Sequence, residues 1–138
     1  MEYKGIETAA DYKAKGDKFY DEKDYDNAIK NYDMAIALND NDVEVYFNRG
    51  MLHLIKEEYE NAIECYSKVI DIEPDYAKAH YCRGYVYYVK KEHDKAIKDY
   101  NKVIDIKPDY AEAYYCRGNT YYFINRNISV SKSRIQYQ

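Results

Sequence analysis

Apolar side chains recur every three or four residues along most of the chain, with polar residues between them. In residues 93–106 they are Ala96, Ile97, Tyr100, Val103 and Ile104, which would form a stripe along one face of an α-helix. The same pattern, interrupted by short polar breaks, predicts helices over 9–21, 25–38, 43–55, 59–72, 76–89, 93–106 and 110–124.

The ends of these elements carry further signals. Asp75 and Asp109 each follow a proline, and we expect them to cap the next helices, because a short carboxylate accepts hydrogen bonds from first-turn amides. Residues 127–137 alternate apolar and polar side chains, which favours a strand over a helix.

The helices belong to a repeat of 34 residues, which indicates stacked helical hairpins. A glycine in mid-helix costs about 1 kcal/mol relative to alanine. A glycine at the same phase of every repeat therefore predicts close helix contact, with alanines of the second helix as partners. The recurring residues are Gly16, Gly50, Gly84 and Gly118; Ala28, Ala62 and Ala96; Tyr32, Tyr66 and Tyr100; and Pro74 and Pro108.

This pattern resembles the tetratricopeptide repeat (TPR) family over residues 9 to about 123. Departures are Asp40 in place of the usual proline, and Val130 and Arg134 in place of alanine and an aromatic residue. The resemblance implies an all-α, right-handed superhelical solenoid of antiparallel helix pairs with about three and a half repeats. The implied divisions are an N-terminal extension (1–8), three repeats (9–42, 43–76, 77–110), the first helix of a partial fourth (111–124) and a divergent basic tail (125–138).

The resemblance also divides the aromatic residues, which include 20 tyrosines, between a core and a groove. It implies that the groove is concave, lined by the first helix of each pair, and binds a peptide. The residues expected in the core are Tyr12, Tyr46, His80, Tyr114, Phe19, His53, Tyr87, Tyr121, Tyr32, Tyr66 and Tyr100. The residues expected to bind in the groove are Lys13, Asp17, Phe47, Asn48, Met51, Lys78, Tyr81, Cys82, Tyr85, Tyr88, Tyr115, Asn119 and Tyr122.

Charge and composition restrict the partner. The formal net charge is −4, and residues 126–138 hold three basic side chains and no acidic one. All acidic side chains lie in residues 1–125, and this acidic part of the chain argues against nucleic acid and anionic membranes as partners. No segment is predicted to be a signal peptide or to span a membrane, so we expect a cytoplasmic protein. The three cysteines lack zinc-ligand spacing, and we expect reduced thiols.

A subclass of the family binds the acidic C-terminal peptide of heat-shock chaperones through a carboxylate clamp of Lys, Asn, Asn, Lys and Arg. The corresponding residues are Lys13, Asp17, Asn48, Lys78 and Cys82, so three of the five match. The acidic Asp17 would repel the peptide carboxylates, and Cys82 lacks the donor fork of arginine. The sequence predicts weak clamp binding at most.

These features favour one function, leave a second open and disfavour a third. The leading one is a non-enzymatic interaction module, or scaffold, whose aromatic groove holds a partner segment with basic and apolar residues. The second is a self-assembling unit, dimeric through the C-terminal repeat and tail; the tail could also cap the last repeat or fill the groove. An enzyme is disfavoured, because no phosphate loop, nucleophile elbow or metal spacing occurs. No cofactor and no catalytic or metal-binding residue is predicted.

Overall fold

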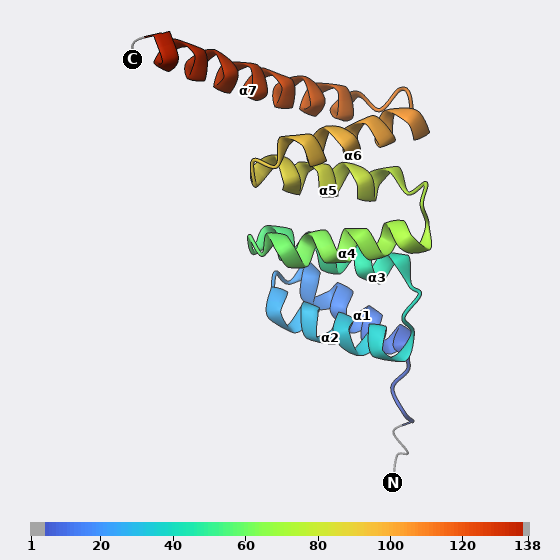
Figure 1. Cartoon of the computed structure of the whole chain (residues 1–138). Helices are drawn as coiled ribbons and strands as arrows, with labels where there is room; N and C mark the ends of the chain where they lie inside the picture. The colour runs from blue at the N-terminus through green and yellow to red at the C-terminus, as the bar shows by residue number, and fades with distance from the viewer. Residues whose placement is uncertain (1–4, 137–138) are drawn as a thin grey trace. The chain divides into compact units, whose positions relative to one another are not determined.

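The computed structural model describes residues 5–136, which form seven α-helices and, within that range, no strand (Figure 1). The predicted all-α helical repeat is confirmed, and five of the seven helices have the expected bounds. Contacts divide the chain into two compact units, Met1–Pro74 and Asp75–Gln138. The first contains α1 (Ala9–Asp21), α2 (Tyr25–Leu38), α3 (Val43–Ile55) and α4 (Tyr59–Ile72); the second contains α5 (Ala77–Val89), α6 (His93–Ile106) and α7 (Ala111–Gln136).

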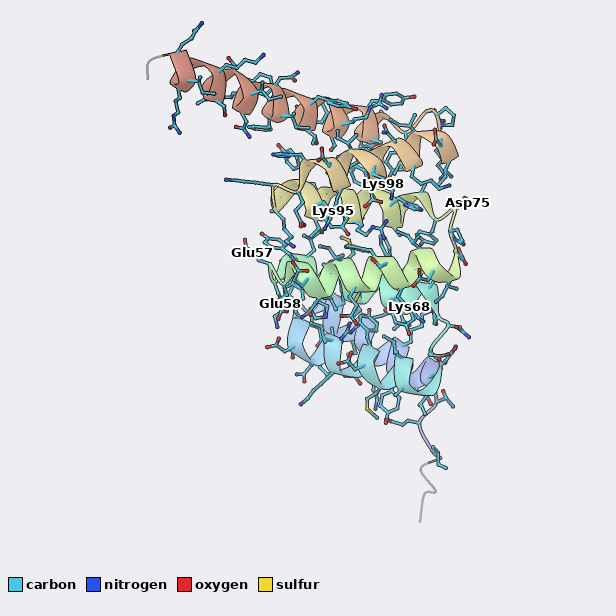
Figure 2. The ribbon with its side chains drawn as sticks, viewed as in Figure 1. Glu57, Glu58, Lys68, Asp75, Lys95 and Lys98 are labelled. Carbon is cyan, nitrogen blue, oxygen red and sulfur yellow. The ribbon has the colours of Figure 1, made fainter. Side chains whose placement is uncertain are left out.

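Helices α1 and α2, α3 and α4, and α5 and α6 form antiparallel pairs joined by the same short turn. One residue of each turn has a left-handed backbone: φ is 60° at Lys23, 58° at Glu57 and 62° at Lys91. Figure 2 labels Glu57 and the next residue, Glu58, whose amide donates to the carbonyl oxygen of His53 at 2.8 Å. Backbone hydrogen bonds of this kind compensate the strain of left-handed geometry, which costs about 1–2 kcal/mol for a residue with a Cβ atom.

Close approach at the repeated glycines is confirmed in all three helix pairs, but the partner is a tyrosine. A Cβ atom on Gly16 would lie 2.5 Å from the ring of Tyr32. The corresponding distances are 2.8 Å from Gly50 to Tyr66 and 2.9 Å from Gly84 to Tyr100. The predicted alanine partners were wrong in this respect: Ala28, Ala62 and Ala96 are fully buried, but the glycine makes room for the ring.

The predicted core is confirmed for six of the nine residues that lie in complete helix pairs. Tyr32, Tyr66 and Tyr100 are at most 1% exposed, and His53 and His80 are buried. The prediction was wrong for Tyr114 and Tyr121 on α7, which are exposed because no second helix covers them. Tyr46 is also buried, whereas Tyr12, Phe19 and Tyr87 are partly buried.

The predicted caps were wrong at two helices. Helices α5 and α7 begin at Ala77 and Ala111, one residue later than expected. This places Tyr76 at the N-cap of α5, where no side chain makes a capping hydrogen bond, instead of Asp75. Asp109 likewise lies two residues before α7. Acidic capping does occur at α3, where Asp42 accepts hydrogen bonds from the amides of Glu44 and Val45.

The strand expected near the C-terminus was also wrong, because α7 continues as one helix to Gln136. Its second half runs past the first residues of α6, because the two helices are antiparallel (Figure 1). Asn125 has the same phase as the turn residues Lys23, Glu57 and Lys91, yet the helix does not turn there. Extending an existing helix avoids the nucleation cost of a new one, and residues 125–136 carry no stripe that would pack back. None of the helices in residues 5–136 is long and apolar enough to cross a membrane.

Candidate functional site

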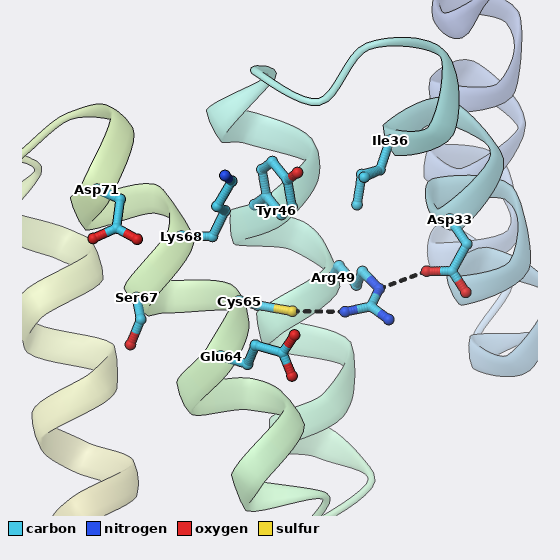
Figure 3. A pocket seen from close by; sticks show the side chains of 9 residues that line it. All are labelled: Asp33, Ile36, Tyr46, Arg49, Glu64, Cys65, Ser67, Lys68 and Asp71. Atoms are coloured by element: carbon cyan, nitrogen blue, oxygen red, sulfur yellow. Dashed lines mark hydrogen bonds and ion pairs between the residues drawn. The ribbon is translucent and has the colours of Figure 1, made fainter.

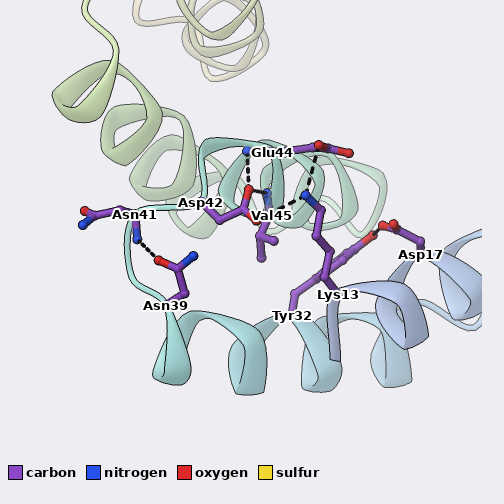
Figure 4. Close-up of polar contacts among 8 residues, drawn as sticks. All are labelled: Lys13, Asp17, Tyr32, Asn39, Asn41, Asp42, Glu44 and Val45. Carbon is purple, nitrogen blue, oxygen red and sulfur yellow. Dashed lines mark hydrogen bonds and ion pairs between the residues drawn. The ribbon is translucent and has the colours of Figure 1, made fainter. Parts of the chain in front are cut away.

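In the first unit, the predicted binding residue Lys13 is held by acidic side chains. Its Nζ lies 3.2 Å from Asp42 Oδ2 and 3.1 Å from Glu44 Oε2 (Figure 4). Partial burial disfavours the charge, but the hydrogen bonds that Lys13 donates to Glu44 and Asp42 outweigh it and raise the pKa of Lys13. The lysine therefore joins α1 to the start of α3, and the two carboxylates compensate its positive charge.

Asp17 and Asn48 meet at the hydroxyl of a core tyrosine. Tyr32 donates a hydrogen bond of 2.5 Å to Asp17 Oδ1 (Figure 4), and Asn48 contacts the same hydroxyl. Burial, followed by the contact with Asp17, raises the pKa of Tyr32. Asp17 stands at the position where the carboxylate clamp has an asparagine. Its charged carboxylate accepts the hydrogen bond of the buried Tyr32 hydroxyl.

Phe47 and Met51 pack around the next core tyrosine. The ring of Phe47, which is buried, lies 5.7 Å from that of Tyr66. The hydroxyl of Tyr66 donates to Met51 Sδ at 3.2 Å. Phe47 is therefore a packing residue, and it leaves little surface for a ligand.

In the second unit, two of the predicted residues also lie close to the core. Cys82 is buried. Tyr81 is half-buried; its hydroxyl lies 3.5 Å from Cys116 Sγ, and its ring lies 5.4 Å from that of Tyr110. Burial raises the pKa of the Tyr81 phenol. Lys78 on α5 is exposed.

The remaining aromatic residues of α5 and α7 form an exposed surface. Tyr85 is 40% exposed, Tyr122 62% and Tyr115 72%. Tyr88 connects α5 to α7, because its ring centroid is 6.4 Å from that of Tyr85 and 6.0 Å from that of Phe123. We call this surface the aromatic face; it consists of Tyr81, Tyr85, Tyr88, Tyr115, Asn119, Tyr122 and Phe123.

A hollow of about 330 Å³ adjoins the aromatic face. Tyr88 and Phe123 line it together with His93, whose ring lies 6.4 Å from that of Tyr88, and with Asn127. Phe123, His93 and Asn127 were not among the residues predicted to bind a partner. Phe123 has the spacing of a groove residue and could have been included. Asn127 could not, because α7 was expected to end before it.

Another hollow, of about 530 Å³, lies among α2, α3 and α4 and is centred on Arg49 (Figure 3). Arg49 Nε donates to Asp33 Oδ1 at 2.7 Å, and an Nη donates to Cys65 Sγ at 3.0 Å. Burial raises the pKa of the Cys65 thiol, and the nearby guanidinium only partly offsets this effect. The donors of Arg49 are thus used to join three helices. In residues 5–136, no group of three or more His, Cys, Asp and Glu side chains could hold a metal ion.

The comparisons with known proteins concern the repeat. The family model described as TPR repeat matches residues 16–55, 52–91 and 84–123. The crystal structure of MamA superposes with a TM-score of 0.81 at 30% sequence identity, over 85% of this chain and 68% of that one. The first TPR of Spaghetti (RPAP3), bound to the HSP90 peptide SRMEEVD, gives 0.80 at 22% identity, over 88% of this chain and 99% of that one. The latter likeness concerns the fold alone.

A sequence relative is the Hsp70-Hsp90 organising protein of Plasmodium falciparum (isolate 3D7). It is 39% identical over 44 residues, which are 32% of this chain and only 8% of that protein's length. The family match covers most of the chain, and it agrees with the helix pairs and with the tyrosine-covered glycines. The chain therefore belongs to the tetratricopeptide repeat family, whose domains mediate protein–protein interaction.

Proposed function

We propose that this chain is a non-enzymatic interaction module that binds a peptide or helix of a partner protein on its aromatic face. The observation that carries the proposal is the exposure of Tyr85, Tyr115 and Tyr122 beside the half-buried Tyr88. Tyrosine offers a large contact area with few rotatable bonds, which is why recognition surfaces favour it. Clustered exposed apolar side chains typically mark binding sites.

The partner segment combines apolar residues with lysine or arginine. Glu112 is exposed in the first turn of α7, on the helix that carries Tyr115 and Tyr122. A cation can pair with this carboxylate or lie over a tyrosine ring. Two acidic residues of the first unit are less available, because Glu44 on α3 pairs with Lys13, and Asp17 of the predicted groove accepts a hydrogen bond from Tyr32.

Replacing both Tyr85 and Tyr88 with alanine should weaken peptide binding at least about tenfold, because truncating central aromatic residues removes most of an interface's energy. Peptides selected from a random 12-residue library on the wild-type protein provide the ligand. Their affinities for both proteins are measured by fluorescence anisotropy, and circular dichroism checks that helicity is retained.

Tyr121→Ala is the matched control, since Tyr121 is an equally exposed tyrosine of the same unit outside the aromatic face. It should leave the affinity unchanged. Equal affinity of wild type and double variant, or an equal loss in the control, would refute the proposed site.

Binding of chaperone tails is a second candidate, favoured by the known relatives. Two solved structures with this fold hold such peptides, one from HSP90 and one, with the second TPR domain of human RPAP3, from HSP70. In this chain Lys13 is already paired with two carboxylates, and Asp17 adds a negative charge. Any binding of an acidic tail would therefore be weak.

Asp17→Asn should strengthen binding of the peptide SRMEEVD several-fold. It removes a like charge, while the amide oxygen can still accept the hydrogen bond from Tyr32. Isothermal titration calorimetry of wild type and variant gives the comparison, with a peptide of reversed sequence as control. Tight binding to the wild type, unchanged in the variant, would show that Asp17 does not oppose acidic ligands.

A further inference from the structure

The glycine of α7 lacks the ring that covers the same glycine in the complete helix pairs. An added Cβ atom would meet the ring of Tyr32 at Gly16, of Tyr66 at Gly50 and of Tyr100 at Gly84. At Gly118 it would meet nothing within 4 Å. The site that receives a tyrosine from a second helix is thus formed on α7 and left open.

The neighbours of Gly118 are exposed in the same way. Tyr114 is 43% exposed, whereas Tyr46, at the same phase of α3, is 9% exposed. Tyr121 is 46% exposed, whereas His53, at the same phase, is 4% exposed. We call Tyr114, Arg117, Gly118 and Tyr121 the open face of α7. It is distinct from the aromatic face and turned to solvent.

Comparison of Arg117 with Arg83 indicates that a helix covering α7 would supply a carboxylate to Arg117. Arg83, at the same phase of α5, donates two hydrogen bonds to the buried Asp99 of α6, at 2.9 and 2.7 Å. Arg117 donates instead to Asn101 at 2.9 Å, and no residue of a following helix stands opposite it within the described range. The open face therefore combines a glycine notch that fits a tyrosine ring with a guanidinium that fits a carboxylate.

The residues that follow in the chain do not supply such a helix. Residues 125–136 extend α7 and are exposed. Their sequence also lacks the pattern of a second helix: Val130, Ser131 and Arg134 stand where α6 has Ala96, Ile97 and Tyr100. Folded back, this segment would place a second guanidinium over Gly118.

We propose that the open face of α7 binds an acidic amphipathic helix of another protein, packed as the second helix of a pair. A tyrosine of that helix lies over Gly118, and the acidic residue before it binds Arg117, as Asp99 before Tyr100 binds Arg83. Apolar residues of the helix cover Tyr114 and Tyr121. Recognition of one helix face through residues three and four apart is a general mode of binding.

Charge favours an acidic partner over a second copy of this chain. Helix α7 carries four basic side chains, Arg117, Arg126, Lys132 and Arg134, and one acidic side chain, Glu112. Pairing two copies of α7 would bring these basic groups together, and like charges oppose association. An acidic helix lying along α7 would instead meet Arg117 near the notch and the other cations beyond it.

The chain itself provides the probe, because α4 is an acidic helix that covers such a notch. The probe is a synthetic peptide of residues 59–72 with the substitution Cys65→Asp, which places an aspartate directly before Tyr66, as Asp99 stands before Tyr100. The peptide keeps Ala62 and has three further acidic residues and one lysine. A lactam bridge on its exposed side holds it helical, since isolated helices of this length are marginal. The same peptide with Tyr66→Ala is the control ligand.

The matched protein variant is Gly118→Ala. In the free protein its methyl group has space, and alanine is the better helix former, so the variant folds at least as well. In the complex the methyl group would stand where the other glycines meet a ring at less than 3.0 Å. Binding of the peptide should weaken at least about tenfold, similar to the loss with the Tyr66→Ala peptide.

The proposal is overturned if the bridged peptide does not bind the wild-type protein, or if it binds Gly118→Ala equally well. It is also overturned if light scattering shows a wild-type dimer that Gly118→Ala converts to a monomer, because the occupant would then be a second copy. The Tyr85→Ala/Tyr88→Ala variant should bind the peptide as the wild type does. The proposal for the open face and the proposal for the aromatic face can thus be refuted independently of each other.

Discussion

Asp99→Ala should lower the free energy of unfolding by about 3–5 kcal/mol, the usual cost of removing one partner of a buried ion pair. Asp99 is 3% exposed and accepts two hydrogen bonds from Arg83, and Nδ1 of the buried His80 lies 3.6 Å from its Oδ1. Without the carboxylate, the guanidinium would be left partly buried without its main partner. Urea unfolding followed by circular dichroism measures the loss.

The chain offers a matched control, because Cys65 stands at the same phase in α4 and accepts a hydrogen bond from Arg49. Asp99→Cys should therefore cost less than Asp99→Ala. Equal losses in the two variants would mean that a thiol cannot replace the carboxylate as the acceptor for Arg83.

The ion pair of Asp99 with Arg83 should also make the free energy of unfolding depend on pH. Burial alone would raise the pKa of Asp99, but the hydrogen bonds from Arg83 and the nearby imidazole of His80 outweigh it and hold the pKa below the ordinary value of 3.8. A depressed pKa stabilises the fold above the pKa of the unfolded state, and the effect is lost as pH falls through the folded-state value. The stability gap between wild type and Asp99→Ala should thus be full near neutral pH and narrow below about pH 4.

Gly16→Ala should destabilise the first unit by a net amount of up to about 2 kcal/mol. The new methyl group would lie 2.5 Å from the ring of Tyr32, which is 1% exposed and cannot move aside. Overpacking of this kind costs about 1–3 kcal/mol or more. A gain of about 1 kcal/mol in helix propensity offsets part of that cost.

Gly118→Ala is the control with the opposite sign. The substitution is the same and the glycine has the same phase, but no ring lies over it, so only the gain in helix propensity remains. Thermal unfolding of both variants tests the comparison. A stabilised Gly16→Ala, or a destabilised Gly118→Ala, would contradict the packing described for these glycines.

The helix pairs were predictable because their signals are local and repeated. The spacing of Ala96, Tyr100 and Val103, and the 34-residue interval, predicted both the helices and the buried tyrosines. The partner of each glycine was not predictable from spacing alone, since alanine and tyrosine lie on the same face of the second helix. The structure shows that the large ring needs the space.

The end of the chain was predicted poorly because its residues lack a partner. Alternating side chains in residues 127–137 favoured a strand, but residues through Gln136 extend a helix already formed from Ala111. Tyr114 and Tyr121 have the phase of core residues, and only the missing second helix leaves them exposed. The positions that are buried in complete helix pairs do not show whether a second helix is present beside α7.

Exposure was predicted correctly for some of the proposed binding residues and wrongly for others. Tyr85, Tyr115 and Tyr122, which are exposed, were assigned to the groove because the resemblance to the repeat family implies it. The sequence could not show that Phe47 and Cys82 are buried, or that the ends of Lys13 and Asp17 are held by other side chains, because these depend on contacts between helices.

The most direct test of the account is an NMR titration of the protein, with isotope-labelled tyrosine rings, by the best library-selected peptide. The account predicts that the rings of Tyr85, Tyr88, Tyr115 and Tyr122 shift with a common affinity, while those of Tyr114 and Tyr121 stay in place. Shifts at Tyr114 and Tyr121 alone, or at tyrosines of the first unit alone, would contradict the assignment of partner binding to the aromatic face.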